Sequence, residues 1–234
     1  MKSIRRTASA LLAGAALASL AAVPAPGQTT TLPRILTFRE QVATVNRTTL
    51  RRLERILPAA MEKTGFDMWI IVSNEDNLDP VFQTMIPMDL WCPIVQILVL
   101  SRNPDGSVER LNLSRTDMKG FHKDAWDWRA WDSEKKESQW DALARVVRER
   151  DPKTIAINES EEIWAAGGLT AALKERLVKT VGPVYAGRFR PGVEPAILWL
   201  ETLLDEELEL FQRAVAVAHA LIAEAFSSRA ITPG

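Results

Sequence analysis

Residues 66–73 read FDMWIIVS, an almost unbroken apolar run of the length of a strand. A strand that is apolar on both faces is typical of the centre of a sheet that is covered on both sides. A second run of this kind, IVQILVL, occupies residues 94–100. The turn residues Asn-Pro-Asp-Gly follow it at 103–106, so residues 108–113 are predicted to return as its hairpin partner. These strands predict the core of an α/β layer.

Helical patterns lie on both sides of these strands in the sequence. A capping box at residues 37–40, Thr-Phe-Arg-Glu, opens a helix before the first strand. Leu50, Leu53, Leu57 and Ala60 recur at helical spacing, and Thr64-Gly65 supplies a stop. After the hairpin, one helical face runs over residues 140–147 and is ended by the Asp-Pro pair at 151–152.

The remaining elements complete an α/β fold with a mixed sheet. A short strand, TIAIN, is predicted at residues 154–158, and Ser160 opens a further helical region. Another short strand is predicted at residues 184–186. We therefore expect one α/β domain over residues 34–190, with a linker around residues 189–195.

The C-terminal segment has a helical pattern of its own. A long helix is expected from Asp205, its N-cap residue, with a single apolar stripe along its length. The stripe comprises Leu208, Phe211, Val215, Ala218, Ile222 and Phe226. Two explanations stay open: the stripe packs on the preceding α/β layer, or residues 196–234 begin a second domain that continues beyond them. The Pro-Gly turn signal at 233–234 favours the second.

The N-terminal residues have the layout of a secretory signal peptide. Lys2, Arg5 and Arg6 precede a run of small apolar residues, 8–23, and small residues suitable for cleavage follow. The run is shorter than the ~20 residues of a comfortable membrane span. We expect residues 1–27 to be removed on export, by the general or the twin-arginine route, leaving a periplasmic or secreted protein that is not held in a membrane.

The composition excludes several kinds of chemistry. The chain of 234 residues holds one cysteine and two histidines, which excludes an intramolecular disulfide and a zinc site built from cysteine or from several histidines. Its formal net charge is -1, so nothing indicates a nucleic-acid partner.

Two stretches carry candidate binding residues. Trp126, Trp128 and Trp131 stand among charged residues, a composition that can bind sugars, cations or peptide prolines, although core packing is the alternative. The acidic loop at residues 75–79 could hold a hard cation. Its simpler interpretation is a solvated loop in which Asp79 caps a short helix.

Residues 74–82 (NEDNLDPVF), the strand at 94–100 and residues 206–234 together resemble the creatinase/Xaa-Pro aminopeptidase family, the pita-bread metallopeptidases, in its exported bacterial form. Residues 151–158 also fit the last strand of that family's N-terminal domain. The resemblance covers residues 36–234. It implies a creatinase-like N-terminal domain followed by the first helix of the catalytic domain.

The resemblance also implies that the catalytic residues lie elsewhere. Members of the family bind two divalent metal ions (Mn, Co or Zn) through two Asp, one His and two Glu, all beyond the first catalytic-domain helix. No residue of this chain matches those ligands, so we expect no catalytic and no metal-binding residue here, and no activity of this chain alone. The implied partners are the catalytic domain and further copies of the complete protein in a homo-oligomer.

Trp91 is the one residue to which the resemblance gives a candidate role. In the family, the N-terminal domain can lend an aromatic side chain to the entrance of a neighbouring active site, and Trp91 lies in that region of the sequence. The alternative from a different functional class is a free-standing exported module that binds a ligand through the tryptophan cluster.

Overall fold

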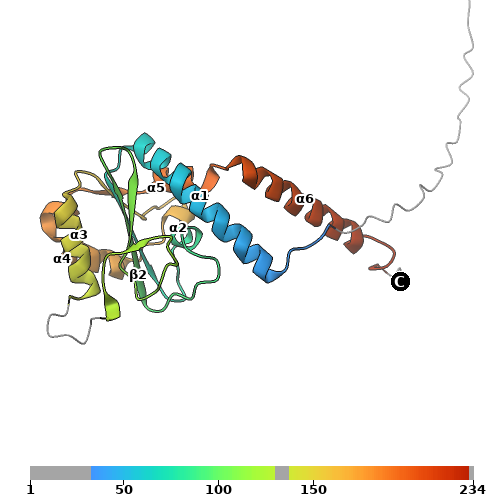
Figure 1. The fold of residues 1–234 in the computed structure, drawn as a ribbon, viewed down its shortest axis with the longest axis horizontal. Coiled ribbons are helices and arrows are strands. Elements are labelled where there is room, and N and C mark those ends of the chain that lie inside the picture. The colour runs from blue at the N-terminus through green and yellow to red at the C-terminus, as the bar shows by residue number, and fades with distance from the viewer. Residues whose placement is uncertain (1–32, 130–136, 232–234) are drawn as a thin grey trace, which may run out of the picture. The chain divides into compact units, whose positions relative to one another are not determined.

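The strands predicted from residues 66–113 form the middle of a six-stranded mixed sheet in the computed structural model, which describes residues 33–129 and 137–231 (Figure 1). The strands are β1 (Met68–Asn74), β2 (Val95–Arg102), β3 (Val108–Asn112), β4 (Lys123–Asp124), β5 (Ile155–Ile157) and β6 (Phe189–Pro191). Their order is β4-β3-β2-β1-β5-β6. The pairs β1–β2 and β2–β3 are antiparallel, and the other neighbours are parallel. The α/β class and the mixed sheet are thus confirmed.

Helices cover both faces of this sheet. They are α1 (Phe38–Thr64), α2 (Pro80–Thr84), α3 (Gln139–Arg150), α4 (Ala171–Ala186), α5 (Val193–Glu201) and α6 (Asp205–Ala225), with a short 3-10 helix, η2, at Trp164–Ala166. Helices α1, α2 and α5 lie on one face, and α3 and α4 lie on the other (Figure 1). The result is a three-layer arrangement with two apolar cores.

The helices on both faces of the sheet explain why residues 68–72 of strand β1 are all apolar. Trp69 and Ile71 point into the core under α1, α2 and α5, whereas Met68, Ile70 and Val72 point into the core under α3 and α4. All five side chains are at most 1% exposed. A strand at the centre of a sheet with helices on both faces has no solvent-facing side, so alternation with polar residues is lost.

The first helix begins and ends where the sequence predicts. Thr37 accepts a hydrogen bond from the Glu40 amide, and the Glu40 carboxylate accepts one from the Thr37 amide at 2.8 Å. At the other end Gly65 adopts the left-handed conformation, with φ of 72°. Both caps therefore satisfy backbone groups that a helix end leaves free.

The region after β5 differs from the prediction. Residues 184–186, predicted as a strand, are helical and form the end of α4 beyond a kink at Gly182, whose φ is 78°. Pro183 follows the kink. Proline suits the first turn of a helix because it has no N–H group, and N–H groups at that position have no acceptor within the helix. The region between β5 and α4 holds η2, so α4 begins at Ala171 and not at Ser160.

Residues 189–195, predicted as a linker, belong to the α/β layer. Phe189 pairs with Ile155 in the sheet, and α5 starts at Val193. Trp199 of α5 is fully buried in the core beside α1. The layer therefore extends to the end of α5, past the predicted boundary at residue 190.

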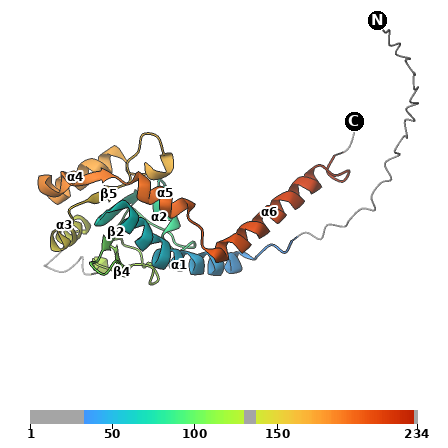
Figure 2. The same cartoon turned by 90° about the horizontal axis from the view of Figure 1, so that it is seen from above.

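The predicted long C-terminal helix is present as α6, and it projects away from the layer (Figure 2). Its N-cap is Leu204, one residue before the predicted Asp205. Glu207 explains the shift, because its carboxylate accepts a hydrogen bond from the Leu204 amide at 2.8 Å. None of the helices in the described residues is long and apolar enough to cross a membrane.

Candidate functional site

The apolar stripe of α6 lies on the surface. No side chain of this 21-residue helix is buried. Phe211 is 62% exposed and Ile222 is 56% exposed, and Phe226, just after the helix, is 77% exposed. The possibility that the stripe packs on the α/β layer is therefore wrong for this structure. Large apolar side chains exposed in a row are typical of a surface that contacts another part of a protein or a partner.

An open apolar groove of about 820 Å³ lies where α6 leaves the layer. One wall is α1, a second is the segment after α2, and the third is the first three turns of α6. Its apolar lining includes Val45, Ile86, Met88, Leu90, Leu210 and Phe211. The groove and the stripe are continuous through Phe211, which belongs to both.

Arg52 of α1 lines this groove and is buried. Its guanidinium donates to the Glu207 carboxylate of α6 at 2.8 Å and to the Thr202 carbonyl at 2.8 Å. It also donates to the Trp199 carbonyl and lies over the Trp199 ring, 4.7 Å from its centroid. One side chain thus joins α1, the end of α5 and the start of α6.

Trp91 lies on the connection between α2 and β2 and is 73% exposed. Its neighbour Cys92 is buried in the core beneath α1 and α2, which anchors the connection. An indole this exposed is free to contact another molecule. The role of Trp91 at the entrance to an active site stays a prediction.

The tryptophan cluster is divided by the structure. Trp126 is buried and donates from Nε1 to the Glu137 carbonyl at 2.8 Å. Trp128 is partly buried against the core under α3, and the Arg129 guanidinium lies 4.6 Å from its ring centroid. Trp131 lies outside the described residues. Because the chain is not a strand here, Trp126 and Trp128 do not share a strand face.

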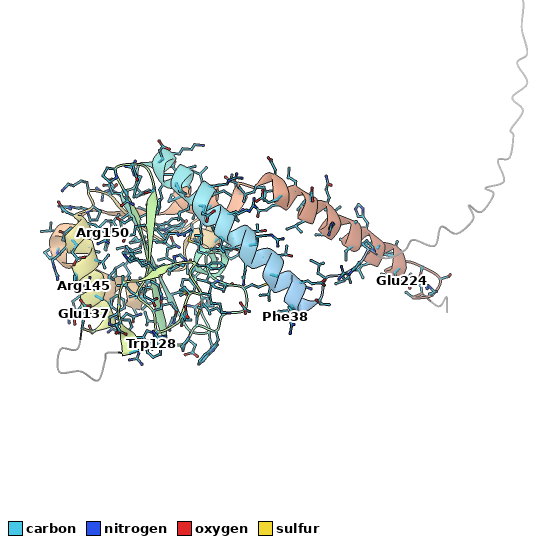
Figure 3. The ribbon with its side chains drawn as sticks, in the orientation of Figure 1. Phe38, Trp128, Glu137, Arg145, Arg150 and Glu224 are labelled. Carbon is cyan, nitrogen blue, oxygen red and sulfur yellow. The ribbon has the colours of Figure 1, made fainter. Side chains whose placement is uncertain are left out.

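A hollow of about 370 Å³ adjoins Trp126. Trp140 of α3 also lines it, with Arg176 stacked on the Trp140 ring at 4.5 Å. Glu137 and Ser138, which precede α3, lie at its rim. Figure 3 shows Trp128 and Glu137 at the same end of the layer. Trp126 is thus the member of the tryptophan cluster that lines this hollow.

The acidic loop is built around a buried carboxylate. Asp79 is fully buried, and it caps α2 by accepting a hydrogen bond from the Phe82 amide at 2.9 Å. Asn158, at the end of β5, donates to both Asp79 oxygens at 2.9 Å. Burial raises the pKa of Asp79, and the Phe82 and Asn158 hydrogen bonds oppose that shift. The helix-capping interpretation is confirmed, with proline at the first helical position.

His122 and Cys92 are also buried, and burial keeps both side chains in their neutral forms. Burial lowers the pKa of His122 to about 4, and its Nε2 lies 2.8 Å from the Met85 carbonyl. Burial raises the pKa of Cys92 to about 11. Both are therefore neutral at pH 7. Within the described residues, no three His, Cys, Asp or Glu side chains gather in a way that could hold a metal ion.

The Arg52–Glu207 pair was not among the predicted residues. The two residues are 155 positions apart in the sequence. The one local signal was Glu207 itself, three residues after Leu204, in the position of the acidic member of a capping box.

Comparisons of this chain with family models, with curated proteins and with solved structures found no match.

Proposed function

We propose that this chain is the N-terminal, non-catalytic portion of an exported metallopeptidase of the creatinase/Xaa-Pro aminopeptidase type. Its α/β layer supports assembly and restricts access to the substrate site, and α6 is the first helix of the catalytic domain. The two metal ions (Mn, Co or Zn) of the complete enzyme would be bound by residues outside this chain. Metal-activated water would attack the peptide carbonyl there.

The observation that carries the proposal is the uncovered stripe of α6. A helix that belongs to the α/β layer would bury one face against it, as α1 and α3 do. Helix α6 buries none of its side chains on this layer. A helix with one apolar face and no partner is incomplete, and a second domain that packs on the stripe would complete it.

The positions of the resembling segments agree with this proposal. Residues 74–82 form the end of β1, the acidic loop and the start of α2. Residues 151–158 contain β5, and residues 206–225 form most of α6. The segments thus lie in a mixed-sheet layer that precedes a long helix, which is the order that the resemblance implies.

Two further features belong to the same proposal. The export signal at residues 1–27, which lies outside the described residues, would deliver the protein to the periplasm or the medium. The exposed side chain of Trp91 would reach the active-site entrance of a neighbouring copy in a homo-oligomer. In the complete enzyme, Trp91→Ala would then raise KM more than it lowers kcat.

Two measurements test the proposal. The first is the coding sequence beyond codon 234, where an open frame that supplies Asp, Asp, His, Glu and Glu in the family's order would support it. The second is a dipeptidase assay of the purified 234-residue chain with added Mn²⁺, Co²⁺ or Zn²⁺. We expect no turnover, and metal-dependent hydrolysis by this chain alone would contradict the proposal.

The hollow beside Trp126 favours a second candidate function, a module that binds a small ligand. Trp126 and Trp140 provide apolar surface there, and Arg176 provides a positive charge suited to an anionic group. This second function is tested by titrating the protein with candidate sugars and short peptides while tryptophan fluorescence is measured. A saturable change that Arg176→Met abolishes would support the module, and a flat titration would exclude it for those ligands.

A further inference from the structure

The connection between α5 and α6 is short and is held at both ends by one ion pair. It comprises residues 202–204 only. The Arg52 guanidinium donates to the Trp199 and Thr202 carbonyls, which α5 leaves free at its C-terminal end. Glu207 accepts from the Leu204 amide at the start of α6. The bond between Arg52 and Glu207 therefore joins the C-cap of one helix to the N-cap of the next.

This ion pair is shielded from water far better than its neighbour. The side chains of Arg52 and Glu207 are 10% and 16% exposed, whereas those of Arg51 and Glu206, which pair one residue earlier, are 52% and 35% exposed. An ion pair held away from water is screened less by salt and is costly to break, because each partner would be left desolvated. Arg51–Glu206 is a matched pair on the same two helices without that property.

The surface beside this pair favours a different position of α6. The groove has Val45 and Met88 on one side and Leu210 and Phe211 on the other. These side chains are exposed or half-buried, although they lie across a single open space. Closing the groove would remove apolar surface from water, which is favourable. Among the residues that the structure describes, only the ion pairs of Arg51 and Arg52 make polar contacts between α1 and α6.

We propose that Arg52 and Glu207 form a latch that holds α6 away from the groove, and that loss of the ion pair lets the apolar face of α6 close over it. With the latch intact, the angle at the 202–204 connection is fixed and the stripe stays available. With the latch broken, Leu210 and Phe211 pack against Val45 and Met88. The proposal concerns this chain alone and does not depend on the proposed function.

A distance measurement between spin labels tests the latch. Labels are placed at Glu62→Cys on α1 and Ala216→Cys on α6, both exposed positions. The only native cysteine, Cys92, is buried with a raised pKa and stays unlabelled. Double electron–electron resonance on the 234-residue chain should give one dominant distance. Arg52→Met should shift the distribution or add a second population, and Arg51→Met should leave it unchanged.

A second substitution keeps the test valid if Arg52→Met fails to fold. Glu207→Gln removes the charge but keeps an oxygen for the Leu204 amide, so the start of α6 is preserved. It should change the distance distribution in the same direction. Reduced dye binding should accompany the change as the stripe becomes covered. The proposal would be overturned if Arg52→Met and Glu207→Gln both gave the distance distribution of the parent. It would also be overturned if Arg51→Met shifted the distribution as much as they do.

Discussion

Strand β1 and helix α6 are both rich in large apolar residues, and the structure treats them in opposite ways. The apolar side chains of β1 are at most 1% exposed because helices cover both faces of the sheet. In α6, by contrast, no side chain is buried. An apolar pattern thus indicates that a segment has a surface to cover. The pattern does not indicate whether the covering surface lies in the same chain.

The largest effect expected from this contrast comes from one substitution made in both environments. Phe82 is fully buried beneath α1 and α5, and Phe211 is 62% exposed on α6. Phe82→Ala should lower the free energy of unfolding by about 3–5 kcal/mol, because it removes buried surface and leaves a cavity. Phe211→Ala should change it by less than about 0.5 kcal/mol. Urea denaturation of the two variants checks this, and equal losses would contradict the contrast.

The second prediction concerns the pH dependence of stability. The pKa of His122 is lowered to about 4 in the folded state by burial, with a smaller contribution from Arg110, against about 6.5 in the unfolded chain. Between these values the unfolded state binds the extra proton, so stability falls as the pH falls from 6.5 to 4. The loss attributable to His122 should be about 3 kcal/mol.

The difference between the parent and His122→Gln isolates this effect. Glutamine can still donate to the Met85 carbonyl but does not titrate. The raised pKa of Asp79 acts in the opposite direction, because the folded state then holds its proton to higher pH, and this contribution cancels in the comparison. Parallel profiles for the parent and His122→Gln would contradict the assignment.

A somewhat smaller effect is expected at Asp79. Asp79→Ala removes the cap of α2 and leaves the Asn158 amide without its acceptor, so stability should fall by about 2 kcal/mol. Asn158→Ala and the double variant complete a cycle. The two losses should be less than additive, since both substitutions break the same hydrogen bonds. Strict additivity in thermal or urea unfolding would show that the pair does not act as a unit.

The smallest stability effect should come with a large change in surface properties. Ile222→Glu on α6 should leave the free energy of unfolding within about 0.5 kcal/mol of the parent. It should nevertheless reduce binding of a dye such as anilinonaphthalene sulfonate, because it interrupts the exposed stripe. Unchanged dye binding would place the exposed apolar surface elsewhere on the molecule.

The parts of the fold that depend on local patterns were predictable from the sequence. Strand β1, the capping box at Thr37 and the hairpin of β2 and β3 follow from runs, spacing and turn residues. Residues 184–186 were predicted wrongly because Val-Tyr-Ala suits a strand locally, whereas Pro183 begins a further helical turn. Phe189 was assigned to a linker because three residues are too few to show a pattern.

The candidate site was predictable only in part. The exposed stripe follows from helical periodicity, and the structure adds that nothing in the layer covers it. The contact between Arg52 and Glu207 depends on how α1, α5 and α6 pack together, and no local pattern reports that. The burial of Trp126 likewise depends on its packing beneath α3.

Hydrogen–deuterium exchange of the 234-residue chain tests the central claim, that α6 is uncovered while the α/β layer is complete. Amides of β1 should exchange only on global unfolding, because both faces of the strand are covered. Amides in the second half of α6 should exchange through local opening, orders of magnitude faster. Equal protection of α6 and β1 would mean that the stripe is covered in solution, and it would contradict the account.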